Sequence, residues 1–233
     1  MSRLKNLTGF FKKKRPNVPA RIMVTKGGRS SLDENYNRLK DNILYFGLSG
    51  KKVIQVEATI EGEGKTTLVS NLGVSLAFND KKVVVLDLDF RNPGISKVFG
   101  LDEALGVSDY VIEDSPLESI IKHTEYNVDV ITRGRVVYNS SVVLNSDKMK
   151  NLIEELKNRY DFILLDCPPV LLMSDYMHIS EYADGILYTV AANFVKKYAV
   201  KESIALLSKL DVPFIGCVMT GVNQNDAFYR IDK

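Results

Sequence analysis

One glycine-rich segment combines the residue types that bind phosphate. It runs from Ala58 to Thr67 and reads ATIEGEGKTT. Two closely spaced glycines let consecutive backbone N–H groups converge on an anion, Lys65 can reach terminal phosphates, and the Thr66 hydroxyl can bind Mg²⁺. The segment therefore predicts a phosphate loop for a nucleoside triphosphate with Mg²⁺. The predicted nucleotide-binding residues are Gly62, Glu63, Gly64, Lys65, Thr66 and Thr67.

The match to the standard phosphate-loop pattern is incomplete, which leaves two alternatives. The pattern G-x-x-x-x-G-K-[ST] requires glycine where this chain has Thr59. One alternative is a glycine-rich turn with a surface lysine, and the other is a dinucleotide loop with Asp87 about 20 residues downstream. A dinucleotide loop has no use for Lys65 and Thr66, so these two residues favour the nucleoside triphosphate.

Three acids follow apolar runs further along the chain. Asp87 and Asp89 end the run KVVVLDLD, and Asp166 ends the run FILLD. Alternate residues of an extended chain share a face, so we expect Asp87 and Asp89 to point to one side. Carboxylates at the carboxyl ends of strands beside a phosphate loop suit Mg²⁺ binding or proton abstraction, and Asp166 resembles a Walker B acid. The alternative for the pair is a polar strand end without chemistry.

Alternating strand and helix patterns must position these residues. Apolar runs predict strands at 53–58, 82–89, 128–132, 162–166, 185–191 and 214–219. Helical patterns lie at 33–46, 65–78, 147–159, 175–183 and 197–209, and Ser30, Ser31 and Asp33 are capping candidates for the first helix. Such alternation predicts an α/β fold with a doubly wound, mostly parallel sheet and an N-terminal helical extension.

Length and composition fit one globular domain. The chain has 233 residues, of which 45% are hydrophobic and 26% are charged. No apolar stretch is long enough to span a membrane, and no secretion signal is evident. Cys167 and Cys217 have the spacing of neither a disulfide framework nor a metal site, so we expect a reducing cytoplasm.

The N-terminus is strongly basic. Residues 1–30 carry nine Lys or Arg and no acid, which leaves the rest of the chain with a net charge of about −7. The cluster from Phe10 to Arg15 could rest on anionic lipid, although a solvated, flexible arm is the plainer expectation. Nucleic acid is not expected as a partner, because an acidic body repels phosphate.

These motifs together resemble the cytoplasmic tyrosine kinases of bacteria that control capsule and exopolysaccharide synthesis. The resemblance covers about residues 30–223. It is carried by Gly62–Thr67, DLDFRNP at Asp87–Pro93, DCPP at Asp166–Pro169, GVSDY at Gly106–Tyr110, and Ser174-Asp175. It implies a P-loop NTPase fold of the deviant Walker type at 30–225, with a basic arm at 1–29 and a short tail at 226–233.

The resemblance also implies roles for individual residues. ATP would occupy the phosphate loop with Lys65 at its phosphates, and Thr66, Asp89 and Asp166 would hold Mg²⁺. Asp87 would be the base that takes the proton of a tyrosine hydroxyl, which is mostly protonated at neutral pH. The implied partners are protein tyrosine substrates, further copies of the chain, and the cytoplasmic tail of a membrane activator or polysaccharide co-polymerase. The expected location is the inner face of the cell membrane, held through that partner.

Two departures from the family concern assembly and regulation. Family members end in a cluster of tyrosines, whereas this chain has only Tyr229 after Tyr198, so Tyr229 or another protein is the expected acceptor. The family's ring-assembly motif Glu-x-x-Arg-x-x-Arg here has Asn37 and Lys40 in place of both arginines. Lysine lacks the bidentate fork of arginine, so a weaker ring contact is expected.

Three further positions bear on the nucleotide. Ile60 stands where partition and septum-positioning ATPases carry a second lysine that reaches across a dimer. Thr220 stands where relatives often place an asparagine that reads the base, and Glu61 replaces a common loop proline. Ile60 therefore disfavours a sandwich-dimer ATPase.

Three functions remain open from the sequence. The first is an active protein-tyrosine kinase, acting on itself or on other proteins, that regulates capsular or exopolysaccharide synthesis and export. The second is a nucleotide-binding regulatory subunit of a polysaccharide assembly system with little or no kinase activity. The third and most distant is a positioning ATPase. The complete set of charged residues for Mg-ATP chemistry favours the kinase.

Overall fold

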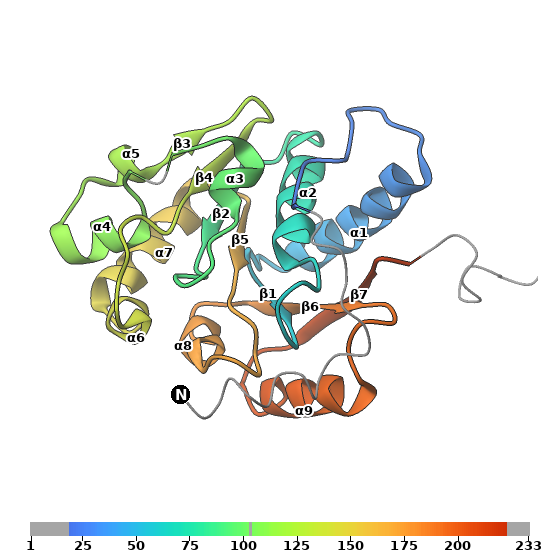
Figure 1. Cartoon of the computed structure of the whole chain (residues 1–233). Helices are drawn as coiled ribbons and strands as arrows, with labels where there is room; N and C mark the ends of the chain where they lie inside the picture. Colours follow the sequence, from blue (N-terminus) through green and yellow to red (C-terminus); the bar gives the residue numbers. More distant parts are fainter. Residues whose placement is uncertain (1–18, 103, 223–233) are drawn as a thin grey trace, which may run out of the picture.

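The structure of the chain is a computed structural model that describes residues 19–102 and 104–222 (Figure 1). Within these residues, seven strands form one sheet in the order β3-β4-β2-β5-β1-β6-β7. Every neighbouring pair is parallel except β3 with β4. The strands are β1 (Val53–Ala58), β2 (Val83–Asp87), β3 (Lys122–His123), β4 (Val128–Ile131), β5 (Phe162–Asp166), β6 (Gly185–Ala191) and β7 (Phe214–Thr220). The predicted doubly wound, mostly parallel sheet is confirmed.

The central strands are covered on both faces. β1, β2 and β5 are buried along their whole length, which is why they read as continuous apolar runs. β2 ends at Asp87, two residues earlier than expected, so Asp89 lies in the following turn. The two-residue β3 was not predicted, because so short a strand leaves no alternating pattern.

Helices cover the two faces of the sheet. α1 and α2 pack on the face that carries Ile54 and Val56, while α7, α8 and α9 lie on the opposite face (Figure 1). The helices are α1 (Ser31–Gly47), α2 (Lys65–Ala77), α3 (Ile95–Phe99), α4 (Val107–Glu113), α5 (Leu117–Ile120), α6 (Ser140–Leu144), α7 (Asp147–Arg159), α8 (Asp175–Ser180) and α9 (Lys197–Leu207). α3 to α6 have at most seven residues each and were not predicted, because two turns show no clear period.

The N-terminal part of the described chain is held against the phosphate-loop helix. Ser30 caps α1 in a reciprocal capping box with Asp33, as the sequence indicated. Further along, the Asn71 side chain on α2 accepts hydrogen bonds from the N–H groups of Met23 (2.6 Å) and Val24 (3.1 Å) and donates to the Thr67 carbonyl (2.8 Å). The aromatic and basic cluster at residues 10–15 lies outside the described residues.

Both cysteines are free: Cys167 is buried behind β5, and Cys217 is exposed on β7. In the part of the chain that the structure describes, no helix combines the length and apolarity needed to cross a bilayer.

Candidate active site

The phosphate loop joins β1 to α2 at the carboxyl edge of the sheet. Gly62 and Gly64 have positive φ angles of 82° and 89°, a region that glycine enters without a steric cost. Gly64 is the N-cap of α2 and offers no side chain to cap the helix. The first N–H groups of α2 therefore face the loop at the positive end of the helix dipole, which is an anion-binding arrangement.

The structure brings Thr66 and Asp166 together. Thr66 Oγ1 donates a hydrogen bond of 2.7 Å to Asp166 Oδ2, across 100 positions of sequence. The second oxygen, Asp166 Oδ1, is buried and has no hydrogen-bond partner among the described residues. A buried carboxylate oxygen without a partner is costly unless a ligand satisfies it. This orphaned oxygen beside a hydroxyl fits a bound Mg²⁺.

The side chains at this edge of the sheet suit a magnesium site whose ligands come partly from the protein and partly from nucleotide phosphates. No three His, Cys, Asp or Glu side chains in residues 19–102 and 104–222 gather into a metal site made by protein alone. Mg²⁺ is commonly held by one or two carboxylates together with substrate phosphates. Asp166 and Asp89 can supply those carboxylates, and the phosphate loop places the phosphates beside them.

Asp87 and Asp166 are neighbours on adjacent parallel strands, where they are register partners of β2 and β5. Burial raises the pKa of Asp87 well above its ordinary value, and the negative charge of Asp166 raises it further. Burial also raises the pKa of Asp166, while the nearby Lys65 opposes that shift. Lys65 thus favours the charged form of Asp166, whereas burial and the charges of Asp166 and Asp89 favour the neutral form of Asp87.

Asp87 is enclosed by the turn that follows it. Its Oδ2 accepts hydrogen bonds from the N–H groups of Gly94 and Ile95, both at 3.0 Å, and its Oδ1 accepts one from the N–H of Asp89 at 3.2 Å. Asp89 is 8% exposed and accepts a hydrogen bond from the N–H of Asn92. The sequence placed both acids on one strand face, but only Asp87 belongs to the strand, and Asp89 is closer to solvent.

The same turn lies against the phosphate loop. A Cβ added at Gly94 would lie 2.9 Å from Thr66 Cγ2, so glycine permits the close approach. Lys65, the first residue of α2, is buried beside these acids. The structure thus gathers Lys65, Thr66, Asp87, Asp89 and Asp166 at one edge of the sheet, as the motifs predicted. Tyr229 lies outside the described residues.

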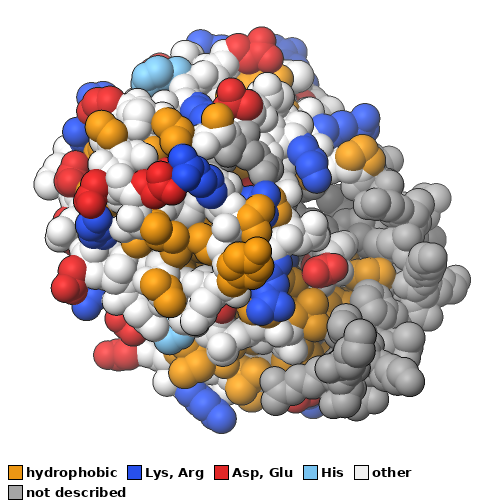
Figure 2. Space-filling view, turned by 60° about the vertical axis from the view of Figure 1, so that its left-hand side comes forward, with side chains coloured by type: hydrophobic (Ala, Val, Ile, Leu, Met, Phe, Trp, Pro, Cys, Tyr) orange, Lys and Arg blue, Asp and Glu red, His pale blue; other side chains and the backbone are white. Residues whose placement is uncertain are grey.

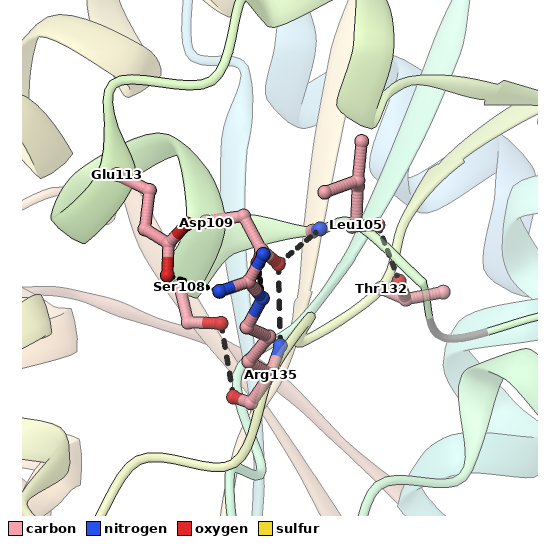
Figure 3. A network of polar contacts seen from close by, with 7 residues as sticks. Leu105, Ser108, Asp109, Glu113, Thr132 and Arg135 are labelled. Atoms are coloured by element: carbon pink, nitrogen blue, oxygen red, sulfur yellow. Dashed lines mark hydrogen bonds and ion pairs between the residues drawn. The ribbon is translucent and has the colours of Figure 1, made fainter.

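A polar network that sequence reasoning missed shapes the loop after β4 (Figure 3). The buried Asp109 accepts hydrogen bonds from the N–H groups of Gly106 (2.9 Å) and Arg135 (3.2 Å). The Arg135 side chain forms ion pairs with Asp109 and Glu113. The motif GVSDY carried the signal, because its aspartate is three residues after a glycine N-cap.

Arg133, in the same loop after β4, contacts the turn that contains Asp89. Its Nη1 donates a hydrogen bond of 3.1 Å to the Phe90 carbonyl.

The surface beside this network mixes charge with exposed apolar groups. Val136 and Tyr138 in the loop after β4, and Val142 on α6, are largely exposed. Figure 2 shows hydrophobic side chains gathered among charged ones on this side of the molecule. Such a surface suits contact with another protein.

A second missed feature lies inside the sheet. Gln55 and Glu57 of β1 are completely buried, and Gln55 Nε2 donates to Glu57 Oε1 (2.7 Å) and to the Tyr176 carbonyl (3.0 Å). Burial raises the pKa of Glu57 to about 8. Two polar residues at i and i+2 in an otherwise apolar strand were the available signal.

Comparison with known proteins gives consistent matches. A family model described as an AAA domain matches residues 51–211. Tyrosine-protein kinase ptk of Acinetobacter johnsonii is 30% identical over 223 residues, which cover 93% of this chain and 30% of ptk. Tyrosine-protein kinase YwqD of Bacillus subtilis is 28% identical over 195 residues, which cover 83% of this chain and 82% of YwqD. The chain thus spans less than a third of ptk and most of YwqD.

Solved structures share the fold. The chimerical protein CapA2B2 superposes with a TM-score of 0.80 at 26% identity, over 88% of this chain and 93% of that one. The septum site-determining protein MinD of Pyrococcus horikoshii, complexed with Mg-ADP, gives a TM-score of 0.60 at 27% identity, over 72% of this chain and 69% of that one. These similarities agree with a phosphate-loop α/β domain.

Proposed function

We propose, since this chain belongs to the AAA-domain family and its relatives are bacterial tyrosine-protein kinases, that it is an ATP-dependent protein-tyrosine kinase of capsular or exopolysaccharide synthesis. The observation that carries the proposal is the hydrogen bond between Thr66 and Asp166 at the N-terminus of α2, whose N-cap Gly64 has no capping side chain. It joins a hydroxyl, a buried carboxylate with a spare oxygen, and a phosphate loop in one place.

The residues of the phosphate loop would bind and orient the nucleotide. When bound, ATP supplies the phosphoryl group and Mg²⁺ neutralises charge on its oxygens. Lys65 and the first N–H groups of α2 would hold the phosphates and would offset the charge that develops during transfer. Thr66, Asp89 and Asp166 are the residues that would hold the metal.

One of the two acids Asp87 and Asp89 would remove the proton from the tyrosine hydroxyl that accepts the phosphoryl group. A tyrosine hydroxyl has a pKa near about 10, so transfer at neutral pH benefits from a base. We assign that role to Asp87 on the resemblance to the family, because it ends β2 as the register partner of Asp166, beside the phosphate loop. The turn from Leu88 to Ile95 must give the hydroxyl access to Asp87, and Asp89 at the solvent side supports the metal.

One observation supports the second candidate, a nucleotide-binding regulator. Within residues 19–102 and 104–222, the hydrogen bonds that Asp87 accepts all come from backbone N–H groups of its own turn, an arrangement that also suits a purely structural acid. The positioning ATPase is the least supported, because Ile60 is completely buried in an apolar cluster with Phe194 and Val195. A side chain at that position faces the interior of this chain and not a partner.

The proposed partners follow from the same relatives. A membrane partner whose cytoplasmic tail activates the kinase at the inner face of the membrane is part of the proposal, on the family resemblance carried by the sequence motifs. On α1, Lys40 Nζ lies 3.5 Å from oxygens of both Asn37 and Asp41, within its own helix. We therefore propose that assembly with further copies of the chain is weak without the activator.

Phosphotransfer to protein tests the proposal. Purified chain is incubated with Mg-ATP and a tyrosine-containing polypeptide, with and without the activator tail, and phosphotyrosine is detected by antibody and mass spectrometry. The kinase predicts phosphotyrosine that is absent from Lys65→Met. ADP release without phosphotyrosine would indicate an ATPase, and nucleotide binding without turnover would indicate the regulator.

A further inference from the structure

Glu63 occupies an unusual place in the phosphate loop. It lies between Gly62 and Gly64, the two residues with positive φ, and its side chain is completely buried. The neighbouring acid Glu61 is exposed. A buried carboxylate in a loop that receives anions needs a reason, because removing the charge from water is costly.

The Glu63 carboxylate forms hydrogen bonds both within the phosphate loop and to strand β6. Its Oε2 accepts a hydrogen bond of 2.8 Å from the N–H of Ile60, where the loop begins. Its Oε1 accepts one of 3.2 Å from the N–H of Ala191, the last residue of β6. One side chain therefore closes the loop on itself and fastens it to a neighbouring strand.

The backbone of Glu63 is fastened as well. Its carbonyl accepts hydrogen bonds from Thr220 Oγ1 (2.7 Å) at the end of β7 and from Thr189 Oγ1 (3.2 Å) on β6. Thr220 Cγ2 also packs where a Cβ on Gly64 would lie, at 3.4 Å. Since the C=O and N–H of a trans peptide point in opposite directions within the peptide plane, the N–H of Gly64 is directed away from Thr220 and Thr189.

We propose that Glu63 is a positioning residue for nucleoside di- and triphosphates, which fixes the phosphate loop to the carboxyl ends of β6 and β7. Its carboxylate acts on the loop and not on the ligand. Thr220 and Thr189 hold the Glu63 carbonyl in place. We call these two hydrogen bonds, together with the two that the Glu63 carboxylate accepts from backbone N–H groups, the bracket. This inference rests on the proposed nucleotide-binding function of the same loop.

The chemistry of the bracket distinguishes glutamate from its amide. Both N–H groups that face the side chain are donors, so each requires an acceptor oxygen. Glutamine supplies one oxygen and one NH₂, which would face an N–H group without a hydrogen bond. Glu63→Gln therefore keeps the size of the side chain and removes one of its two hydrogen bonds to backbone N–H groups.

Binding of Mg-ADP to the full chain, measured by calorimetry, tests the proposal. We expect Glu63→Gln to weaken binding by about 10-fold, the loss that one buried hydrogen bond implies. Glu202→Gln is the control for loss of a negative charge, because Glu202 is an exposed acid on α9, outside the phosphate loop, and it should not weaken binding. Thermal unfolding without nucleotide confirms that each variant is folded.

Variants of Thr220 provide a second test of the proposal, in which Glu63 itself is unchanged. Thr220→Val should weaken Mg-ADP binding several-fold, and Thr220→Ser, which keeps the hydroxyl, should restore it. A merely structural role would not separate valine from serine in binding while leaving both folded. In kinase assays the loss should appear in KM for ATP more than in kcat.

The outcomes separate the two proposals. If the wild type binds Mg-ADP and folded Glu63→Gln and Thr220→Val bind equally well, the bracket is overturned while the nucleotide site stands. If the wild type binds no nucleotide, the function and the bracket both fail.

Discussion

Thr66 Oγ1 and Asp166 Oδ2 are 2.7 Å apart, although they come from helix α2 and strand β5. Their contact aligns the phosphate loop with the carboxyl end of the central strand. It also leaves Asp166 Oδ1 as a buried oxygen without a hydrogen-bond partner among the described residues. We expect this pair to determine how the site responds to Mg²⁺.

Asp166→Asn should weaken the Mg²⁺-dependent part of nucleotide binding by about 10- to 100-fold, because the amide cannot offer a charged oxygen to the metal or to its water ligands. Titration of Mg²⁺ at fixed ADP measures the change, and binding in EDTA should be little affected. Asp161→Asn, near the start of the same strand, is the control for loss of charge. Equal Mg²⁺ dependence in Asp166→Asn and wild type would place the metal elsewhere.

Asp87→Asn should lower kcat by at least about 100-fold, because a base contributes about that much to proton transfer. Nucleotide affinity should change far less, because Asp87 is not among the residues that we propose to hold the nucleotide or the metal. Asp89→Asn should instead raise the Mg²⁺ requirement. Steady-state kinetics at several Mg²⁺ concentrations distinguish the two. The assignment of roles is reversed if Asp89→Asn loses kcat at saturating Mg²⁺ and Asp87→Asn does not.

Glu57→Gln should flatten the pH dependence of stability. The pKa of Glu57 is about 8 in the folded chain against about 4.5 for an ordinary glutamate, so the folded state binds the extra proton between these values. The free energy of unfolding should therefore fall as pH rises from about 5 to about 8, by about 1.4 kcal/mol for each unit of pKa difference at most. Glutamine does not titrate, so the variant lacks this contribution.

Urea unfolding at pH 5.5, 7 and 8.5 measures the slope in nucleotide-free protein. Glu118→Gln, an exposed acid on α5, serves as the control and should keep the wild-type slope. Asp87, Asp166 and Glu63 also have raised pKa values and act in the same direction in both proteins, so the difference between the slopes reports the loss of the Glu57 carboxyl together with its interaction with Asp166. Identical slopes for Glu57→Gln and wild type would contradict the account.

Asp109→Ala should destabilise the chain by about 2–4 kcal/mol, because it leaves the N–H groups of Gly106 and Arg135 without their acceptor in a buried place. Arg135→Ala should cost less than Asp109→Ala, because the Arg135 side chain is 59% exposed and Asp109 Oδ2 keeps both of its backbone hydrogen bonds. Urea denaturation measures both. Equal losses would show that the ion pair, and not the backbone hydrogen bonds, holds the loop.

The sequence was most informative where periodicity is strong. The bounds of β1, β5 and α7 agree with the predicted ranges, because buried parallel strands and amphipathic helices leave clear patterns. The motif residues Lys65, Thr66 and Asp166 also met as expected, since strand ends of a doubly wound sheet share one edge.

Contacts between distant segments could not be predicted from the chain alone. Asn71 holds backbone N–H groups almost 50 residues away, and Glu63 is fastened to β6 and β7 more than 120 residues away. Neither partner leaves a periodic signal in sequence, because a backbone N–H group is present at every residue other than proline. Glu57 was overlooked for a related reason, since a run of apolar neighbours suggested an ordinary buried strand.

The most direct test of the central claim is the number of phosphotyrosines formed per chain with Mg-ATP and the activator tail, mapped by mass spectrometry. Wild type should modify Tyr229 or an added protein, and Lys65→Met should modify neither. Tyr138→Phe, which removes a fully exposed tyrosine, controls for nonspecific modification. ADP binding by the wild type without any phosphotyrosine would contradict the kinase and leave the chain as a nucleotide-dependent regulator.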